Sequence, residues 1–348
     1  MADPGMAEEV AKQIAEDLVT RLQDRTGDTW QVETLAQELP LGPDGNVNLA
    51  EYAPGILEEH GWDYVFYLTE LPAFYEQRPL LCRTVAQSRG ALIVLPSLGA
   101  FRLPAQVLEL VVTLLSTLSG TTTEIDLQSV GKDVRHKNMV QLLPGDSSVV
   151  VLRGPGSKFR MLTGMLRGNK PTRLPTAMSG VLTAGAASGA FGVFYSSIWG
   201  LADAHHPVRL VLIGVLTIAL LATWLIIRNG LWTSEKTPQA RLDNVATVIT
   251  VGIGVFLTYL MLFLGLLFLA WAIVDASYLA SQLEHEATFE SYLRLSWLAA
   301  ALGTMAGALG ANFDSDEAIR QATYSARWHE RRKMFDSYNE SADESDGD

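Results

Sequence analysis

The sequence of 348 residues has a single cysteine, Cys82, and only six histidines. One thiol excludes an intrachain disulfide and any cysteine-clustered metal site. Zinc peptidases hold their metal with two histidines one helical turn apart beside a glutamate, and no histidine pair in this sequence has that spacing. We therefore expect no metal and no cofactor, and we interpret Cys82 as a small core residue.

Basic residues are also scarce, because 26 Lys and Arg stand against 38 Asp and Glu and give a net charge of -12. This acidic balance, without a broad basic surface, makes nucleic acid a poor partner. The first residues show no charged start followed by an apolar core and a cleavage site, which is the pattern of a secretory signal. We therefore expect the first domain to remain in the cytoplasm.

Charged residues are missing from the centres of four long apolar stretches in the second half of the chain. A helix needs about 20 apolar residues to cross roughly 30 Å of hydrocarbon, and each stretch meets that length. The expected spans are residues 178–201, 208–227, 245–274 and 292–311. The sequence thus predicts an all-α domain of four transmembrane helices over residues 176–312. Without an ionisable residue inside a span, a proton-coupled pump is disfavoured.

Small residues recur at helical spacing in the first and fourth of these spans, an arrangement that lets helix backbones approach closely in lipid. We predict that the two spans pack against each other or against a neighbouring copy in a homo-oligomer. The residues assigned to helix packing are Gly180, Ala184, Ser188, Gly192, Ser196, Gly200, Ala299, Gly303, Gly307 and Ala311.

Basic residues gather before the first span, between the second and third, and after the fourth, so these three segments are expected on the cytoplasmic side. Both termini are then cytoplasmic. Residues 158–175 are predicted to form an amphipathic juxtamembrane segment along the anionic inner leaflet, whose lipids are the expected partner. The residues assigned to this contact are Lys158, Arg160, Arg167, Lys170 and Arg173.

The first part of the chain, residues 1–157, mixes helical and strand patterns and predicts a soluble α/β or α+β domain. Helices are expected at 7–22, 49–59 and 104–118, and strands at 29–34, 64–69, 80–85, 91–95 and 149–153. After the last span, we predict a cytosolic helix at residues 313–335 and a disordered acidic tail at residues 336–348.

Two short loops, residues 69–72 and 96–100, follow expected strands and precede a long helix. This layout resembles that of zincin-type metallopeptidases, especially the archaemetzincins. The helix offers only Glu109 as a general base, with no histidine ligands beside it. Peptidase activity is therefore disfavoured, and a catalytically inactive zincin-like scaffold stays open.

Seven short motifs together resemble an uncharacterised actinobacterial family of four-span membrane proteins. The motifs are WD (62–63) with YLTELP (67–72), LPSLGA (95–100), RMLTGMLRGNKP (160–171), NVATVIT (244–250), and ALGA (308–311) before SDEA (315–318). The resemblance covers residues 30 to about 332. It implies a bacterial plasma-membrane location and assigns no function to any residue.

The two expected outer loops carry a second group of candidate ligands. Imidazole and carboxylate can bind a divalent metal, although no ligand spacing connects the loops, and solvated loop charge is the favoured interpretation. The residues are Asp203, His205, His206, Asp275, Glu284, His285 and Glu286.

Two functions of different classes remain open at this point. The first is a non-enzymatic, oligomeric membrane protein with a cytosolic sensing or binding domain, whose helices can also form a channel or transporter. The alternative is a membrane-anchored enzyme, or a degenerate zincin-like pseudoenzyme, that acts at the inner leaflet. The first is favoured because no catalytic motif was found for the second.

Overall fold

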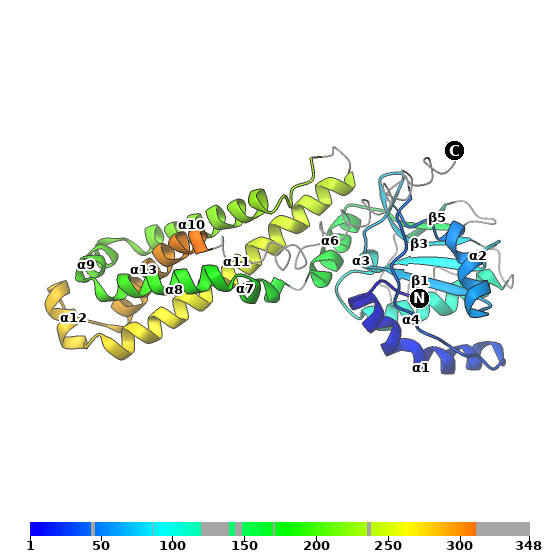
Figure 1. Ribbon diagram of the computed structural model, residues 1–348, viewed down its shortest axis with the longest axis horizontal. Helices are drawn as coiled ribbons and strands as arrows, with labels where there is room; N and C mark the ends of the chain where they lie inside the picture. The colour runs from blue at the N-terminus through cyan, green and yellow to red at the C-terminus, as the bar shows by residue number, and fades with distance from the viewer. Residues whose placement is uncertain are drawn as a thin grey trace, which may run out of the picture. The chain divides into compact units, whose positions relative to one another are not determined.

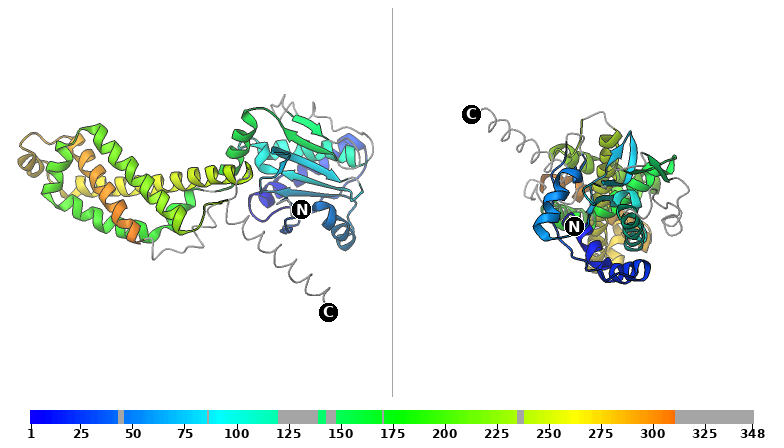
Figure 2. Two further views of the ribbon diagram at one scale, coloured as in Figure 1. Left: turned by 90° about the horizontal axis from the view of Figure 1, so that it is seen from above. Right: turned by 90° about the vertical axis from the view of Figure 1, so that its right-hand side faces the viewer.

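The computed structural model describes residues 1–42, 46–85, 87–119, 139–142, 148–169, 171–234 and 238–310. These residues divide into two compact units (Figures 1 and 2). The first unit contains the described residues of 1–168 and 238–243, and the second contains those of 169–234 and 244–310. The predicted cytosolic helix and acidic tail after residue 312 lie outside the described residues.

A mixed β-sheet forms the centre of the first unit, which confirms an N-terminal α/β region. Its strand order is β1-β4-β3-β6-β5, with β2 paired to β3 beside this path. β1 and β4 are parallel, and the other pairs are antiparallel. The strands are β1 (Val65–Thr69), β2 (Phe74–Tyr75), β3 (Arg78–Val85), β4 (Gly90–Val94), β5 (Met139–Leu142) and β6 (Val149–Leu152).

Helices α1 (Met6–Thr26) and α4 (Leu103–Leu118) lie on one face of this sheet and share its main core (Figure 1). The buried side chains of α1 recur at helical spacing, as the sequence predicted, and the helix ends where Gly27 adopts φ 79° and donates its N–H to the Gln23 carbonyl. α2 (Leu49–His60) packs at the start of β4, where a Cβ on Gly90 would lie 3.4 Å from the Ala53 Cβ.

The prediction of a strand at residues 29–34 is wrong. Residues 28–35 run without a strand ladder, and this run is called the strap below. Trp30 and Val32 of the strap are half-buried against the core of the first unit. Their alternation with polar residues therefore reflects packing of one side of the strap rather than strand pairing.

The described residues of the second unit form helices and the short segments that connect them. The helices are η1 (Pro171–Arg173), α7 (Leu174–Ala177), α8 (Ser179–Phe194), α9 (Ser196–Ala204), α10 (Pro207–Arg228), α11 (Pro238–Ile273), α12 (Ala276–Leu283) and α13 (Phe289–Gly310), with the first turns of α11 assigned to the first unit.

Among the described residues, α10 and α11 are long and apolar enough to cross a membrane. α8 and α9 meet the same criteria only together, and they are bent by 86° at Tyr195. The expected single helix over 178–201 is thus broken, because Tyr195 adopts an extended conformation. Two helices, or three if the bent pair is one span, support a membrane protein, and the predicted count of four is not confirmed.

The backbones of α8 and α13 approach each other closely within this one chain (Figure 1). A Cβ on Gly303 would collide with the carbonyl oxygen of Gly185, and one on Gly307 would lie 2.7 Å from the carbonyl oxygen of Val181. On the α8 side, a Cβ on Gly192 would lie 3.0 Å from the Ala299 Cβ. This packing therefore requires glycine at several positions on both helices.

The residues assigned to helix packing fall into separate groups in the structure. Gly192, Ala299, Gly303 and Gly307 lie in the α8–α13 contact. Gly180, Ala184 and Ser188 are half-buried, Ser196 and Gly200 are exposed in α9, and Ala311 lies outside the described residues. A packing role for these six residues stays a prediction.

Replacing Gly303 with alanine should destabilise the helical unit by about 1–3 kcal/mol, because the new Cβ must displace backbone atoms of α8. The matched control is Gly252→Ala on α11, where a Cβ meets nothing within 4 Å. Thermal unfolding in detergent, followed by tryptophan fluorescence, measures both variants. Equal stability of the two variants would contradict the close packing of α8 on α13.

Candidate ligand-binding site

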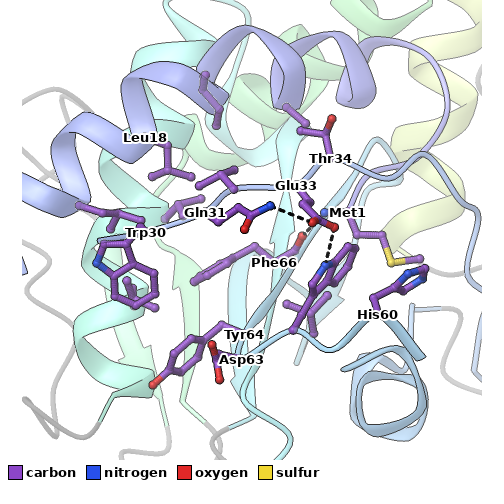
Figure 3. Close-up of a pocket in the computed structure, with 18 of the residues that line it drawn as sticks. Met1, Leu18, Trp30, Gln31, Glu33, Thr34, His60, Asp63, Tyr64 and Phe66 are labelled. Atoms are coloured by element: carbon purple, nitrogen blue, oxygen red, sulfur yellow. Dashed lines mark hydrogen bonds between the residues drawn. The ribbon is translucent and has the colours of Figure 1, made fainter. Parts of the chain in front are cut away.

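A cavity of about 530 Å³ lies in the first unit, between α1, the strap and the start of β1 (Figure 3). Its volume falls within the range of small-molecule sites, which is roughly 300–1,000 Å³. Its apolar side comes from α1, β1 and α4, and its polar side comes from the strap and the turn after α2. The residues that form most of its wall are Ile14, Leu18, Leu22, Asp28, Trp30, Gln31, Val32, Glu33, His60, Trp62, Asp63, Tyr64, Phe66 and Leu115.

Hydrogen bonds hold the strap at both ends. At its start, the Trp30 Nε1–H donates to Thr26 Oγ1 at 2.8 Å. At its end, the Ala2 N–H donates to the Leu35 carbonyl at 2.9 Å, and Ala2 also bridges to Leu68 of β1. Between these points the strap makes no backbone ladder with β1. The side chains of the strap and of β1 line the cavity that separates them.

Aromatic rings form the rim of the cavity. His60 and Trp62 are stacked, with ring centroids 4.6 Å apart and planes at 23°. Trp30 and Tyr64 are tilted against each other at 6.2 Å. Trp30, Trp62, Tyr64 and Phe66 are all half-buried and belong to the cavity wall.

The cavity wall contains acidic side chains. It contains no Lys or Arg. Glu33 accepts hydrogen bonds from Trp62 Nε1–H at 2.9 Å and from Gln31 Nε2–H at 3.3 Å (Figure 3). The Met1 amine lies in the wall as well and donates to the Phe66 carbonyl at 2.9 Å. Burial lowers the pKa of that amine to about 6, so it carries little positive charge at neutral pH.

The loop at residues 69–72, one of the two loops of the zincin-like layout, is engaged in internal contacts. Glu70 Oε1 accepts the Ala7 N–H at 2.8 Å and so caps the first turn of α1. The buried Asp3 carboxylate accepts hydrogen bonds from Thr69 Oγ1 and the Glu70 N–H, both at 2.8 Å, and from the Tyr67 hydroxyl. These carboxylates hold the N-terminal segment on β1.

The other loop, residues 96–100, is held by α6 (Gly156–Gly168). Arg160 donates from Nε to the Ser97 carbonyl at 2.7 Å and from Nη2 to the Leu98 carbonyl at 2.6 Å. Burial lowers the pKa of this guanidinium to about 10. A Cβ on Gly164 would collide with the Pro96 carbonyl oxygen, which explains the glycine.

The residues assigned to contact with the inner leaflet differ in their exposure and in their hydrogen bonds. Arg160 is occupied by these internal hydrogen bonds, and Arg167 donates to the Ala100 carbonyl at 2.5 Å while remaining exposed. Lys158 is exposed. Lys170 and the side chain of Arg173 lie outside the described part of the chain. Lipid contact by the five residues stays a prediction.

The two expected outer loops meet in the second unit through one ion pair. His285 Nε2 lies 2.9 Å from Asp203 Oδ2, and His285 Nδ1 lies 2.9 Å from the Glu286 carbonyl. Arg294 donates to the backbone carbonyl of Asp203 at 3.2 Å. In the described ranges, no group of three or more His, Cys, Asp or Glu side chains is placed to hold a metal. Glu109 of the zincin-like layout instead pairs with Arg21 at 3.1 Å.

Comparison with protein-family models, with characterised proteins and with solved structures finds no match for this chain. The resemblance to an actinobacterial four-span family therefore has no support from these comparisons. Sequence reasoning also missed the cavity. The available signal was four aromatic residues, Trp30, Trp62, Tyr64 and Phe66, within two short segments that each carry an acidic residue.

Removing the Asp203 carboxylate should lower the pKa of His285 toward the ordinary value of 6.5. The hydrogen bond to Asp203 is the main cause that raises this pKa, with the Glu286 carbonyl second. Since the folded-state pKa is raised, the contact stabilises the fold fully below the ordinary histidine pKa and stops doing so as the pH rises through the folded-state value. An NMR titration of labelled histidine in Asp203→Asn measures the shift.

Glu286→Gln is the matched control, because it removes a neighbouring carboxylate and leaves the backbone carbonyl in place. We expect it to titrate like the wild-type protein. An unchanged His285 pKa in Asp203→Asn would show that the two loops do not meet through this pair.

Proposed function

We propose that this chain is an integral membrane protein whose cytosolic α/β unit binds a small molecule in the cavity beside β1. The cavity is the observation that carries the proposal. It combines an apolar floor with a few polar groups at a half-open rim, the usual composition of a small-molecule site. On this proposal, the first unit is the sensing or binding part of a membrane-embedded protein.

The membrane part of the proposal is supported by the outward side chains of the long helices. Leu212, Leu216 and Leu220 of α10 and Phe268 and Trp271 of α11 are all exposed, which suits contact with lipid. We further propose four spans in the bacterial plasma membrane, counting the bent α8–α9 pair and α13, with both termini in the cytoplasm. The distribution of Lys and Arg in the connecting segments supports this orientation.

Assembly into a homo-oligomer, with a channel or transporter as one form of it, belongs to the same proposal. Small residues outside the α8–α13 contact, such as the exposed Ser196 and Gly200, are available to a second copy. The alternative is a membrane-anchored enzyme or pseudoenzyme. Among the described residues, Glu70 and Glu109 of the zincin-like layout are engaged in internal contacts, so ligand binding is favoured over this alternative.

Filling the cavity should abolish ligand binding. Leu18→Trp adds bulk to the floor of the cavity, whereas Val19→Trp places the same side chain one residue away, outside the wall. Small aromatic compounds tested by ligand-observed NMR against the full-length protein in detergent should bind the wild type and Val19→Trp but not Leu18→Trp. Binding that persists in Leu18→Trp, or no binding to the wild type, would contradict the proposed site.

Introduced cysteines test the orientation, because the native thiol gives little background. Cys82 is fully buried, and burial raises the pKa of its thiol to about 12. An impermeant maleimide should label Ser281→Cys on α12 in spheroplasts, and should label Lys12→Cys on α1 only after lysis. Both positions are exposed within their own units. Labelling of Lys12→Cys in intact spheroplasts would overturn the cytoplasmic placement.

A further inference from the structure

The charged side chains in the cavity wall are acidic. Asp28, Glu33 and Asp63 belong to its wall, and no Lys or Arg does. Arg89 lies 4.0 Å from Asp63, at the margin of a salt-bridge distance, with both side chains largely exposed. These three carboxylates are exposed, and their charge favours a cation over an anion at the opening of the cavity.

Glu33 is exposed and contacts the aromatic rim directly. Its two oxygens accept hydrogen bonds from Trp62 and Gln31, which are both neutral donors. These bonds orient the carboxylate but do not neutralise its charge. Figure 3 shows the Glu33 side chain extending from the strap, with both hydrogen bonds directed to its carboxylate.

The aromatic rim provides the second half of a cation site. The faces of tryptophan and tyrosine attract cations, with about 0.5–1 kcal/mol per contact at exposed sites and about 2 kcal/mol or more where water is excluded. The bond from Trp62 to Glu33 places a ring and a carboxylate in direct contact, and the stack with His60 fixes the ring further. Trp30 and Tyr64 present a second ring pair in the same wall.

We propose that the cavity binds a small organic cation, with an ammonium or quaternary ammonium group beside the Glu33 carboxylate and against the aromatic rim, and an aliphatic or aromatic body over Leu18 and Phe66. The inference rests on the proposed function and names the class of its ligand. The apolar floor accepts the body of such a molecule, and the rim accepts its charge. The volume of about 530 Å³ accommodates one compound of this size.

Three benzyl compounds of similar size separate the contribution of charge from that of shape. The probes are benzyltrimethylammonium, benzyl alcohol and phenylacetate, titrated by calorimetry into the full-length protein in a neutral maltoside detergent. We expect the cation to bind about ten-fold more tightly than the alcohol, because about 1.4 kcal/mol of added cation–π and carboxylate attraction corresponds to a factor of ten. Phenylacetate should bind more weakly than either.

The variant Glu33→Gln removes the charge and retains an oxygen that can accept the Trp62 N–H. We expect it to weaken binding of the cation about five-fold and to leave binding of benzyl alcohol unchanged, which also shows that the cavity is intact. The matched control is Glu16→Gln on the exposed side of α1, which should bind all three probes like the wild type. A second variant, Trp62→Leu, should weaken cation binding while retaining the apolar wall.

The outcomes separate this inference from the proposal beneath it. If benzyl alcohol or phenylacetate binds the wild type as tightly as the cation, or if Glu33→Gln changes nothing, the cationic ligand is wrong and the cavity remains a binding site. If none of the three probes binds, the proposed ligand-binding function fails as well.

Discussion

The first unit depends on the placement of two buried carboxylates, Asp3 and Glu70. A buried charge is costly unless hydrogen bonds compensate it, and both carboxylates meet that condition through β1 and the start of α1. Asp3 is also connected to the segment that follows the strap. The Tyr67 hydroxyl donates a hydrogen bond to Asp3 and accepts one from the Leu39 N–H. The N-terminal segment, β1, α1 and residues 35–39 are thus joined at one point, and the cavity lies beside it.

Much of the fold could be predicted from local patterns. α1, α2 and α4 were recognisable because their apolar spacing and flanking residues agree with the tertiary packing. The strap could not be recognised in this way. The alternation of apolar and polar residues at Trp30 and Val32 is the same for a paired strand and for an extended segment that packs on a core. The break at Tyr195 was also hidden, because an apolar run contains no information on a local change from helical to extended backbone.

The packing face of α8 shows why a small-residue pattern gives only an approximate register. Residues four apart on a helix are rotated by about 40°, so a series from 180 to 200 turns through about half a circle and cannot stay on one face. The contact instead follows Gly185, Gly189 and Gly192. The candidate site was harder still, because its rings and carboxylates come from the strap and from the turn after α2, and only tertiary folding places Glu33 beside Trp62.

The bend between α8 and α9 also has a consequence for the surrounding lipid. α8 has 16 residues and is about 24 Å long at 1.5 Å per residue, whereas α10 has 22 residues and is about 33 Å long. If both helices cross the same bilayer, α8 is shorter than the roughly 30 Å hydrocarbon layer and α10 is not. Such hydrophobic mismatch is relieved by local thinning of the bilayer, so the membrane beside α8 is expected to be thinner than the membrane beside α10.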